Sequence, residues 1–231
     1  MPSTLITGAN RGLGLEFARQ YLADGWQVYA TCREPKSPSL LRQLQGTGGN
    51  RMRILPLDVT DTASVKAAAA KLDGQPIDLL LNNAGVMGAR GQTIGTMDYA
   101  DWKNVLDINT LGPMRVSDAF VDHVAQSGRK LIVTLTSGMG SIADNSSGGW
   151  IAYRTSKAAV NMLMRSLAID LAPRGITCVV INPGWVQTDM GGPQATVTAA
   201  ESIARLRRLI DSLGPAQSGK FFNHTGREFP W

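Results

Sequence analysis

The sequence has little of what a metal site or a disulfide framework requires. Its 231 residues include two cysteines and two histidines. Cys32 and Cys178 each lie in an apolar run that resembles a strand, and they lack the CxxC spacing of metal and redox sites, so we expect two buried, reduced thiols. His123 and His224 are isolated. The sequence therefore predicts no metal site.

Long apolar runs are missing as well. The start, MPSTLITGANRG, lacks a charged region followed by a long apolar stretch, so it does not resemble a signal peptide, and no run approaches the length of a membrane span. Apolar residues make up 43% and charged residues 18%, which is typical of a folded globular protein rather than a disordered one. We expect a soluble, cytoplasmic protein with no membrane partner.

The charge balance is basic but not concentrated. A net charge of +5 would attract anions such as nucleic acid, a membrane surface or a phosphorylated cofactor. The densest basic run, RLRRL at 205–209, has helical periodicity and is most simply a solvated helix face. No stripe of alternating aromatic and basic residues appears, so nucleic acid is not an expected partner.

Short β-rich runs alternate with helix-length segments throughout the chain, which predicts a parallel sheet with right-handed crossovers. We expect a single domain over residues 1–231, a Rossmann-type α/β/α sandwich with a mostly parallel, doubly wound sheet of about seven strands. Several strand runs are almost continuously apolar, as expected when helices cover both sheet faces. The expected strands are 3–7, 26–31, 53–57, 77–81, 130–135, 176–181 and 220–222, and the expected helices are 13–24, 62–72, 98–109, 113–127, 153–171 and 199–213.

A glycine-rich turn, TGANRGLG, follows the first strand and leads into a helix. Gly8, Gly12 and Gly14 have the spacing GxxxGxG rather than GxGxxG. Such a turn lets the backbone approach a pyrophosphate at the helix N-terminus, although glycine-rich turns also occur for steric reasons alone.

The end of the second strand, Thr31 to Arg33, carries no carboxylate to hold the ribose hydroxyls of NAD. Arg33 and Arg11, which lies within the glycine loop, would instead suit a 2′-phosphate, because the guanidinium group matches phosphate geometry. We therefore expect NADP in preference to NAD; two solvated surface arginines are the alternative.

Polar residues also follow the third and fourth strands. Asp58 ends LPLDV and could accept from an adenine amino group, while Asp61 is better placed to cap the following helix. The fourth strand runs into NNAG, residues 82–85, which suits a tight polar turn beside a ligand or simply a turn.

The stretch YRTSK places Tyr153 and Lys157 on one face of a helix. Alone, such a pair is an ordinary amphipathic turn. If it is catalytic, the ammonium would favour the phenolate and bring a phenol of pKa about 10 toward neutral pH.

Taken in order, TGANRGLG, the DV after the third strand, NNAG, Asn109, a serine after the fifth strand, YRTSK and PGWVQT resemble the short-chain dehydrogenase/reductase family over the whole chain. The ending, GKFFNHTGREFPW, resembles the compact branch that includes C-factor proteins and sniffer-type carbonyl reductases. The resemblance implies a catalytic tetrad of Asn109, Ser137, Tyr153 and Lys157, in which Tyr153 is the general acid/base, Lys157 also bonds the nicotinamide ribose and Asn109 holds a water of the proton relay.

Two serines are candidates for the tetrad. Ser141 fits the family's usual interval of about a dozen residues before the tyrosine, whereas Ser137 closes the fifth strand and precedes a short turn ending in glycine. We favour Ser137 and treat 141–149 as a flexible insertion.

The resemblance also implies the remaining contacts. Thr188 and the backbone near Val186 would hold the nicotinamide carboxamide, although Pro183-Gly184 also has the character of a simple turn. Substrate would meet an open, permissive site with a short loop at about 186–200. The expected cofactor contacts are Gly8, Asn10, Arg11, Gly12, Leu13, Gly14, Arg33, Asp58, Val59, Asn83, Ala84, Gly85, Tyr153, Lys157, Pro183, Gly184, Val186 and Thr188, and the expected substrate contacts are Met139, Trp150, Trp185 and Met190, with Met87 a further candidate.

The function that follows is NADP(H)-dependent reduction of an aldehyde or ketone to an alcohol, or the reverse, on a small-molecule substrate. The alternative is an NAD(P)-binding signalling or regulatory protein of the C-factor type with incidental catalysis. The resemblance further implies a homodimer or homotetramer formed through the helices near 98–127 and 153–171.

Overall fold

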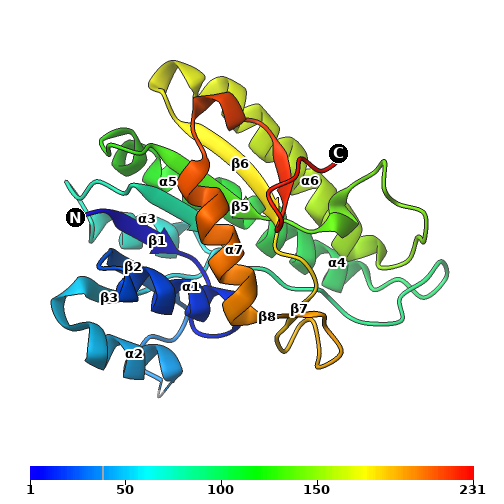
Figure 1. Ribbon diagram of the computed structural model, residues 1–231. Helices are drawn as coiled ribbons and strands as arrows, with labels where there is room; N and C mark the ends of the chain where they lie inside the picture. The colour runs from blue at the N-terminus through cyan, green and yellow to red at the C-terminus, as the bar shows by residue number, and fades with distance from the viewer. Residues whose placement is uncertain (38) are drawn as a thin grey trace.

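The computed structural model describes residues 1–37 and 39–231. Within them, seven parallel strands form one sheet in the order β3-β2-β1-β4-β5-β6-β9 (Figure 1). These strands are β1 (Ser3–Ile6), β2 (Gln27–Cys32), β3 (Met52–Pro56), β4 (Leu79–Asn82), β5 (Leu131–Leu135), β6 (Thr177–Asn182) and β9 (Phe221–Asn223). A separate parallel pair joins β7 (Val186–Gln187) to β8 (Val197–Thr198).

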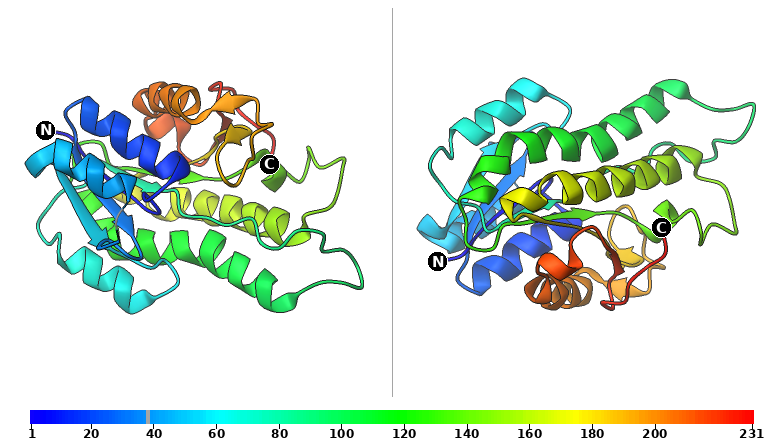
Figure 2. Two further views of the ribbon diagram at one scale, coloured as in Figure 1. Left: turned by 90° about the horizontal axis from the view of Figure 1, so that it is seen from below. Right: turned by 90° about the horizontal axis from the view of Figure 1, so that it is seen from above.

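Helices cover both faces of the sheet, as the two views of Figure 2 show. One layer contains α1, α2 and α7, and the other contains α3, α4, α5 and α6. The helices are α1 (Gly12–Ala23), α2 (Leu40–Gly48), α3 (Thr62–Ala70), α4 (Tyr99–Leu106), α5 (Gly112–Ala125), α6 (Ile151–Asp170) and α7 (Ala199–Ser212). The predicted Rossmann-type α/β/α architecture is confirmed.

The apolar strands separate two hydrophobic cores. In β1, Leu5 packs into the core on one face and its neighbour Ile6 into the core on the other. Leu80 and Leu81 of β4 divide in the same way, because successive side chains of a strand point to opposite faces. Burial on both faces explains why these strands are continuously apolar rather than alternating.

The chain order creates a switch point at β1. From β1 the chain runs outward to β2 and β3, then returns to β4 on the other side of β1 and continues to β5 and β6. Ligands of doubly wound sheets bind in the crevice beyond the carboxyl ends of the strands at such a point. The glycine loop after β1 and the NNAG turn after β4 flank this crevice.

Two helical features differ from expectation. The helix α2, capped by Ser39, was not predicted, because Gly46 and Gly48 lower the helix propensity of its sequence. The expected break between helices 98–109 and 113–127 is instead a π-helical turn over Asp107–Leu111 that joins α4 to α5. As expected, Asp61 caps α3 by accepting from the amide of Ala63 at 2.8 Å.

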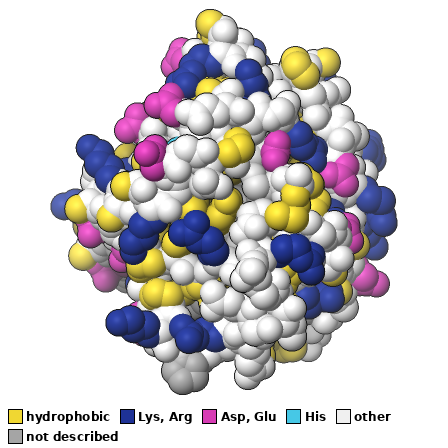
Figure 3. Space-filling model, turned by 90° about the vertical axis from the view of Figure 1, so that its left-hand side faces the viewer, with side chains coloured by type: hydrophobic (Ala, Val, Ile, Leu, Met, Phe, Trp, Pro, Cys, Tyr) yellow, Lys and Arg dark blue, Asp and Glu magenta, His cyan; other side chains and the backbone are white. Residues whose placement is uncertain are grey.

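The surface carries mixed charge. Figure 3 shows lysine and arginine side chains dispersed among acidic and apolar ones over one face of the molecule. Among the described residues, no helix combines the length and apolar character needed to cross a bilayer.

Candidate active site

The NNAG turn after β4 holds the glycine loop through hydrogen bonds. Asn83 Nδ2 donates to the main-chain oxygens of Thr7 (2.8 Å) and Gly8 (3.2 Å), and Thr7 Oγ1 accepts from the amides of Asn83 and Ala84, both at 3.0 Å. A Cβ on Gly14 would lie 2.5 Å from Asn83 Nδ2, so only glycine fits there. The side chain of Asn83, expected to contact a cofactor, is thus a brace for the loop.

The N-terminus of α1 lacks a side-chain cap. Its N-cap, Arg11, makes no side-chain capping bond, so the first amides of the helix remain free for an acceptor such as a pyrophosphate. Gly12, with φ of +54°, faces Thr188: a Cβ there would lie 3.7 Å from Thr188 Cγ2. The glycine loop and the segment after β6 therefore face each other beyond the carboxyl ends of the strands.

Arg11 itself forms an ion pair with Asp189, in the segment after β6. Its Nη1 lies 2.8 Å from Asp189 Oδ2, and both side chains are largely exposed. The prediction that Arg11 reaches a 2′-phosphate therefore meets a competing partner. Arg33, directly after β2, lies near Asp58 instead, and its positive charge lowers the pKa of that carboxyl.

Asp58 is ionised and held locally. Burial raises the pKa of this carboxyl, but hydrogen bonds from Thr60 and the charges of Arg33 and Arg115 outweigh burial and lower the pKa. Its Oδ1 accepts from the amide (2.9 Å) and the hydroxyl (2.7 Å) of Thr60. Val59 is 9% exposed, and its main-chain oxygen accepts from Arg115 at 3.2 Å.

Asn109 sits in the π-turn with its amide group fully occupied. Oδ1 accepts from the amide of Val86 (2.8 Å), and Nδ2 donates to Val86 O (2.8 Å) and to Ser156 Oγ (3.0 Å). Four residues on is Pro113, which has no N–H to offer the main-chain oxygen of Asn109. If Asn109 holds a water, the main-chain oxygen, not the side chain, is the group placed to do it.

Ser137 and not Ser141 meets Tyr153. A hydrogen bond with Ser137 lowers the pKa of the Tyr153 phenol, although burial acts more strongly and the pKa is raised overall. Ser141 Oγ instead donates to the main-chain oxygen of Trp231 (2.9 Å) and accepts from the amide of Asp144 (3.0 Å). Ser137 lies directly beyond β5, where its hydroxyl also accepts from the amide of Met139.

Lys157 approaches the phenol from the next turn of α6. Its Nζ lies 5.7 Å from the centroid of the Tyr153 ring, and a Cβ on Gly85 would lie 3.6 Å from that Nζ. Lys157 is 6% exposed, and burial lowers its pKa to about 8. The expected acidification of the phenol by Lys157 is not what the structure shows, because burial raises the pKa of Tyr153 and the opposing contribution comes from Ser137.

Arg154, the second residue of YRTSK, organises the segment expected to be a flexible insertion. Its Nε donates to the oxygens of Gly148 (2.9 Å) and Gly149 (3.1 Å), and its Nη2 to Ser147 Oγ (2.8 Å). At the other end, the amide of Ala143 donates to Trp231 O at 2.8 Å. The segment 141–149 is thus anchored at both ends. Sequence reasoning missed Arg154, because its contacts with Gly148 and Gly149, five and six residues earlier in the chain, depend on the path of the backbone between them.

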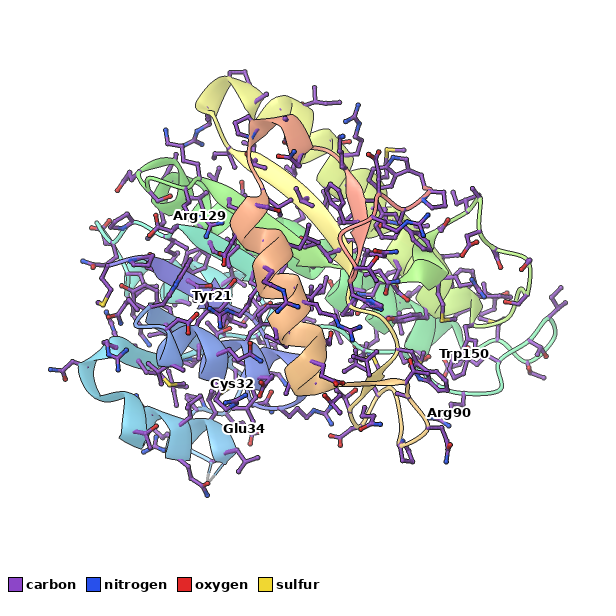
Figure 4. All side chains as sticks on the ribbon, in the orientation of Figure 1. Tyr21, Cys32, Glu34, Arg90, Arg129 and Trp150 are labelled. Atoms are coloured by element: carbon purple, nitrogen blue, oxygen red, sulfur yellow. The ribbon has the colours of Figure 1, made fainter. Side chains whose placement is uncertain are left out.

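A cavity of about 240 Å³ opens beside Tyr153. One wall is the start of α6, and the other is the loop after β4, in which Met87 was the one expected substrate contact. Figure 4 places Trp150 and Arg90, from these two segments, at the same edge of the molecule. The lining residues are Met87, Ala89, Gly91, Gln92, Thr93, Gly149, Trp150, Ile151, Ala152 and Tyr153.

The other expected substrate residues lie elsewhere. Met139 is half-buried in the short turn after Ser137. Trp185 is 54% exposed and donates from Nε1 to Gly191 O at 2.8 Å, and Met190 is 40% exposed. None of the three lines this cavity, so only Trp150 and Met87 of the expected set do. Across the described chain, no group of three His, Cys, Asp or Glu side chains is arranged to hold a metal.

Comparison of the sequence with known proteins identifies the family of the chain. The sequence pattern of the family described as short chain dehydrogenase matches residues 3–198. The chain belongs to that family. This short-chain dehydrogenase is 47% identical over 167 residues to the C-signal of Myxococcus xanthus, covering 72% of the chain and 100% of that protein. It is 33% identical over 237 residues, with both chains fully covered, to 1-hydroxy-2-glutathionyl-2-methyl-3-butene dehydrogenase of a Rhodococcus species.

Solved structures resemble this dehydrogenase along its whole length. The NADPH-bound carbonyl reductase from chicken fatty liver superimposes with a TM-score of 0.92 at 38% identity, covering 100% of this chain and 99% of the other. The carbonyl reductase Sniffer of D. melanogaster gives a TM-score of 0.93 at 33% identity, with both chains fully covered. The expected likeness to the C-factor and sniffer branch is therefore confirmed.

Proposed function

We propose that this short-chain dehydrogenase reduces the carbonyl group of aldehydes or ketones to an alcohol, or catalyses the reverse, with Tyr153 as the general acid/base. The observation that carries the proposal is the meeting of the Ser137 hydroxyl and the Tyr153 phenol beside a cavity. Lys157 lies under the same ring. A proton donor that lines an apolar cavity, with a second hydroxyl and a buried ammonium close to its ring, suits carbonyl chemistry.

The cofactor is NADP, in line with the NADPH-bound chicken reductase and with an NADP-bound short-chain dehydrogenase/reductase from Burkholderia multivorans, which matches with a TM-score of 0.90 at 36% identity. NADPH supplies the hydride. The free amides at the start of α1 suit its pyrophosphate, and Arg33 suits its 2′-phosphate. Thr188, opposite Gly12, would contact the nicotinamide end.

Tyr153 suits proton donation at neutral pH. Because burial raises its pKa, the phenol stays protonated and can give its proton to the oxygen of the reacting carbonyl. Ser137 would donate a hydrogen bond to the same oxygen and hold it toward the phenol. The main-chain oxygen of Asn109, which Pro113 cannot bond, would hold a water that returns the proton by way of Lys157.

The cavity supports an apolar substrate of modest size. Met87, Trp150 and Ile151 line it with apolar groups, while Gln92 and Thr93 supply polar groups from the loop after β4. The short segment 186–200, which includes β7 and β8, would be the substrate loop on the other side. We place the enzyme in the cytoplasm, where its two free, buried cysteines would stay reduced.

Assembly through the layer containing α4, α5 and α6 is part of the proposal. Leu111, Met114, Met162 and Ile169 are exposed on these helices or on the π-turn that joins two of them. Exposed apolar side chains that form a contiguous patch mark an interface between proteins. A homodimer or homotetramer would cover them.

A second candidate is a signalling protein that binds the cofactor and whose catalysis is incidental. The 47% identity to a protein named C-signal favours it. The distinguishing experiment is NADPH oxidation with a panel of aldehydes, ketones and a simple diketone. We expect turnover that falls about 10²–10⁴-fold in Tyr153→Phe, while NADPH still quenches tryptophan fluorescence. Full cofactor binding without turnover of any compound would favour the signalling role.

A further inference from the structure

The outer face of α7 carries two cations that neither the core nor the proposed active site uses. Arg205 and Arg208 lie one helical turn apart and are exposed. Their neighbours Arg207 and Asp211 form ion pairs, with Asp24 and Arg129 respectively. Within residues 1–37 and 39–231, neither Arg205 nor Arg208 has a hydrogen-bonded or ion-paired partner. Two free guanidinium groups on one face are a strong local source of positive potential.

A groove separates these arginines from the turn after β9, which lies beside α7 in the ribbon of Figure 1. Its volume, about 490 Å³, is within the ~300–1,000 Å³ typical of small-molecule sites. It is larger than the cavity beside Tyr153. The lining residues are Arg205, Arg208, Leu209, Ser212, His224, Thr225 and Gly226.

The polar groups of the groove favour an anion. No carboxylate is among its described lining residues. The hydroxyls of Ser212 and Thr225 already donate to Leu209 O (2.7 Å) and Asn223 Oδ1 (2.7 Å). The free donors are therefore the guanidinium groups, whose planar forks match the oxygens of a phosphate. The nearby acid Glu201 is engaged in the capping box of α7 with Thr198.

His224 brings a titratable ring to the groove, close enough to Arg205 for its charge to act on the imidazole. Its Nδ1 is buried and, among the described residues, has no hydrogen-bond partner, which is uncommon for a buried polar atom. The ring packs against Gly184, where a Cβ would lie 2.7 Å from His224 Cδ2. Burial, and then the charge of Arg205, lower the pKa of this imidazole. An anion beside Arg205 would remove that repulsion and raise the pKa again.

We propose that this groove, lined by Arg205, Arg208 and His224, binds the phosphate group of a small phosphorylated metabolite. The two guanidinium groups hold the phosphate oxygens, and the organic part lies along Leu209. The site is separate from the proposed active site, so its occupancy does not depend on carbonyl reduction. Through Gly184, however, His224 contacts the turn at the end of β6 that is proposed to border the nicotinamide.

The two histidines make the proposal testable by NMR, because the chain has only His224 in the groove and His123 on α5. The pKa of each imidazole is measured by proton NMR with inorganic phosphate, with phenyl phosphate, and with sodium chloride at matched ionic strength. We expect both phosphates to raise the midpoint of His224 by about 1 unit and to leave His123 in place. Phenyl phosphate should half-saturate the shift at the lower concentration.

The chloride sample is needed because salt alone screens Arg205 and shifts His224 slightly. The double variant Arg205→Gln/Arg208→Gln should lose the phosphate-specific shift. The matched control Lys66→Gln/Lys71→Gln removes two charges from the opposite layer and should keep it. The site is refuted if phosphate shifts His224 no more than chloride, or if the arginine variant responds as the wild type does. Equal half-saturation by the two phosphates would assign the groove to the free ion and overturn the assignment to an ester.

Discussion

The Nζ atom of Lys157 lies 3.0 Å from the main-chain oxygen of Leu135, the last residue of β5. This hydrogen bond holds the ammonium at the end of β5, where Ser137 follows Leu135 by two residues. Close packing supports it, since a Cβ on Gly140 would lie 2.8 Å from the main-chain carbon of Lys157. The enzyme thus keeps a nearly buried cation at the sheet edge where the proposed chemistry occurs, and burial of that cation costs stability.

Replacing Lys157 with methionine should reveal that cost. The folded pKa of about 8 lies below the ordinary 10.5, so below pH 8 the ammonium is charged in both states and its burial destabilises the fold by roughly 3 kcal/mol. Between pH 8 and 10.5 the folded state loses the proton first, and wild-type stability gains relative to the variant. We expect Lys157→Met to unfold at higher denaturant concentration at pH 7, with the gap narrowing by pH 10. A gap that stays constant from pH 7 to 10 would contradict the lowered pKa of Lys157, and Lys66→Met, at an exposed position of α3, is the control substitution.

The two serines should separate catalysis from stability. Ser137→Ala removes the hydroxyl beside Tyr153, and we expect kcat to fall about 10²–10³-fold, as when a hydrogen-bond donor to a reacting oxygen is lost. Ser141→Ala removes the bonds to Trp231 and Asp144, so it should lower the free energy of unfolding by about 1 kcal/mol with kcat little changed. Steady-state kinetics and urea titration of both variants decide this. The reverse pattern would make Ser141 the catalytic serine.

Arg154 should act on substrate affinity through the loop that it anchors. Loss of its bonds to Ser147, Gly148 and Gly149 would free the wall that leads to Trp150. We expect Arg154→Ala to raise KM for an aromatic ketone about tenfold, because bonds from a charged donor contribute about 1.5–3 kcal/mol, while NADPH binding stays as in the wild type. Arg165→Ala, on the same helix but bonded to Gly219 O, is the control and should leave KM unchanged. An equal loss of NADPH affinity in Arg154→Ala would mean that the helix itself is disturbed.

The two arginines near the cofactor crevice should differ in their effect on cofactor choice. Arg33→Gln should raise the Kd for NADPH about 10–100-fold and leave that for NADH nearly unchanged, since one charge-assisted contact to phosphate is lost. Arg11→Gln should have a smaller effect, because this guanidinium is paired with Asp189. Fluorescence titration with both cofactors measures these constants. Equal weakening of NADPH and NADH by Arg33→Gln would exclude a role for Arg33 in reading the 2′-phosphate.

The sequence by itself determined the elements whose signals are local. Apolar runs set the seven main strands within a residue or two, because burial on both sheet faces requires them. The spacing of Tyr153 and Lys157 placed both on one helix face, and the glycine loop marked the turn after β1. Order along the chain was enough to identify the family.

Only the tertiary structure decided which distant groups meet. Ser137 and Ser141 are four residues apart, and which of them faces Tyr153 depends on how β5 and α6 pack. The pairing of Arg11 with Asp189 and the cavity wall from the loop after β4 likewise join segments far apart in sequence. The pKa values follow from the same packing, because burial of a charge is a property of the surrounding fold and not of the spacing between residues.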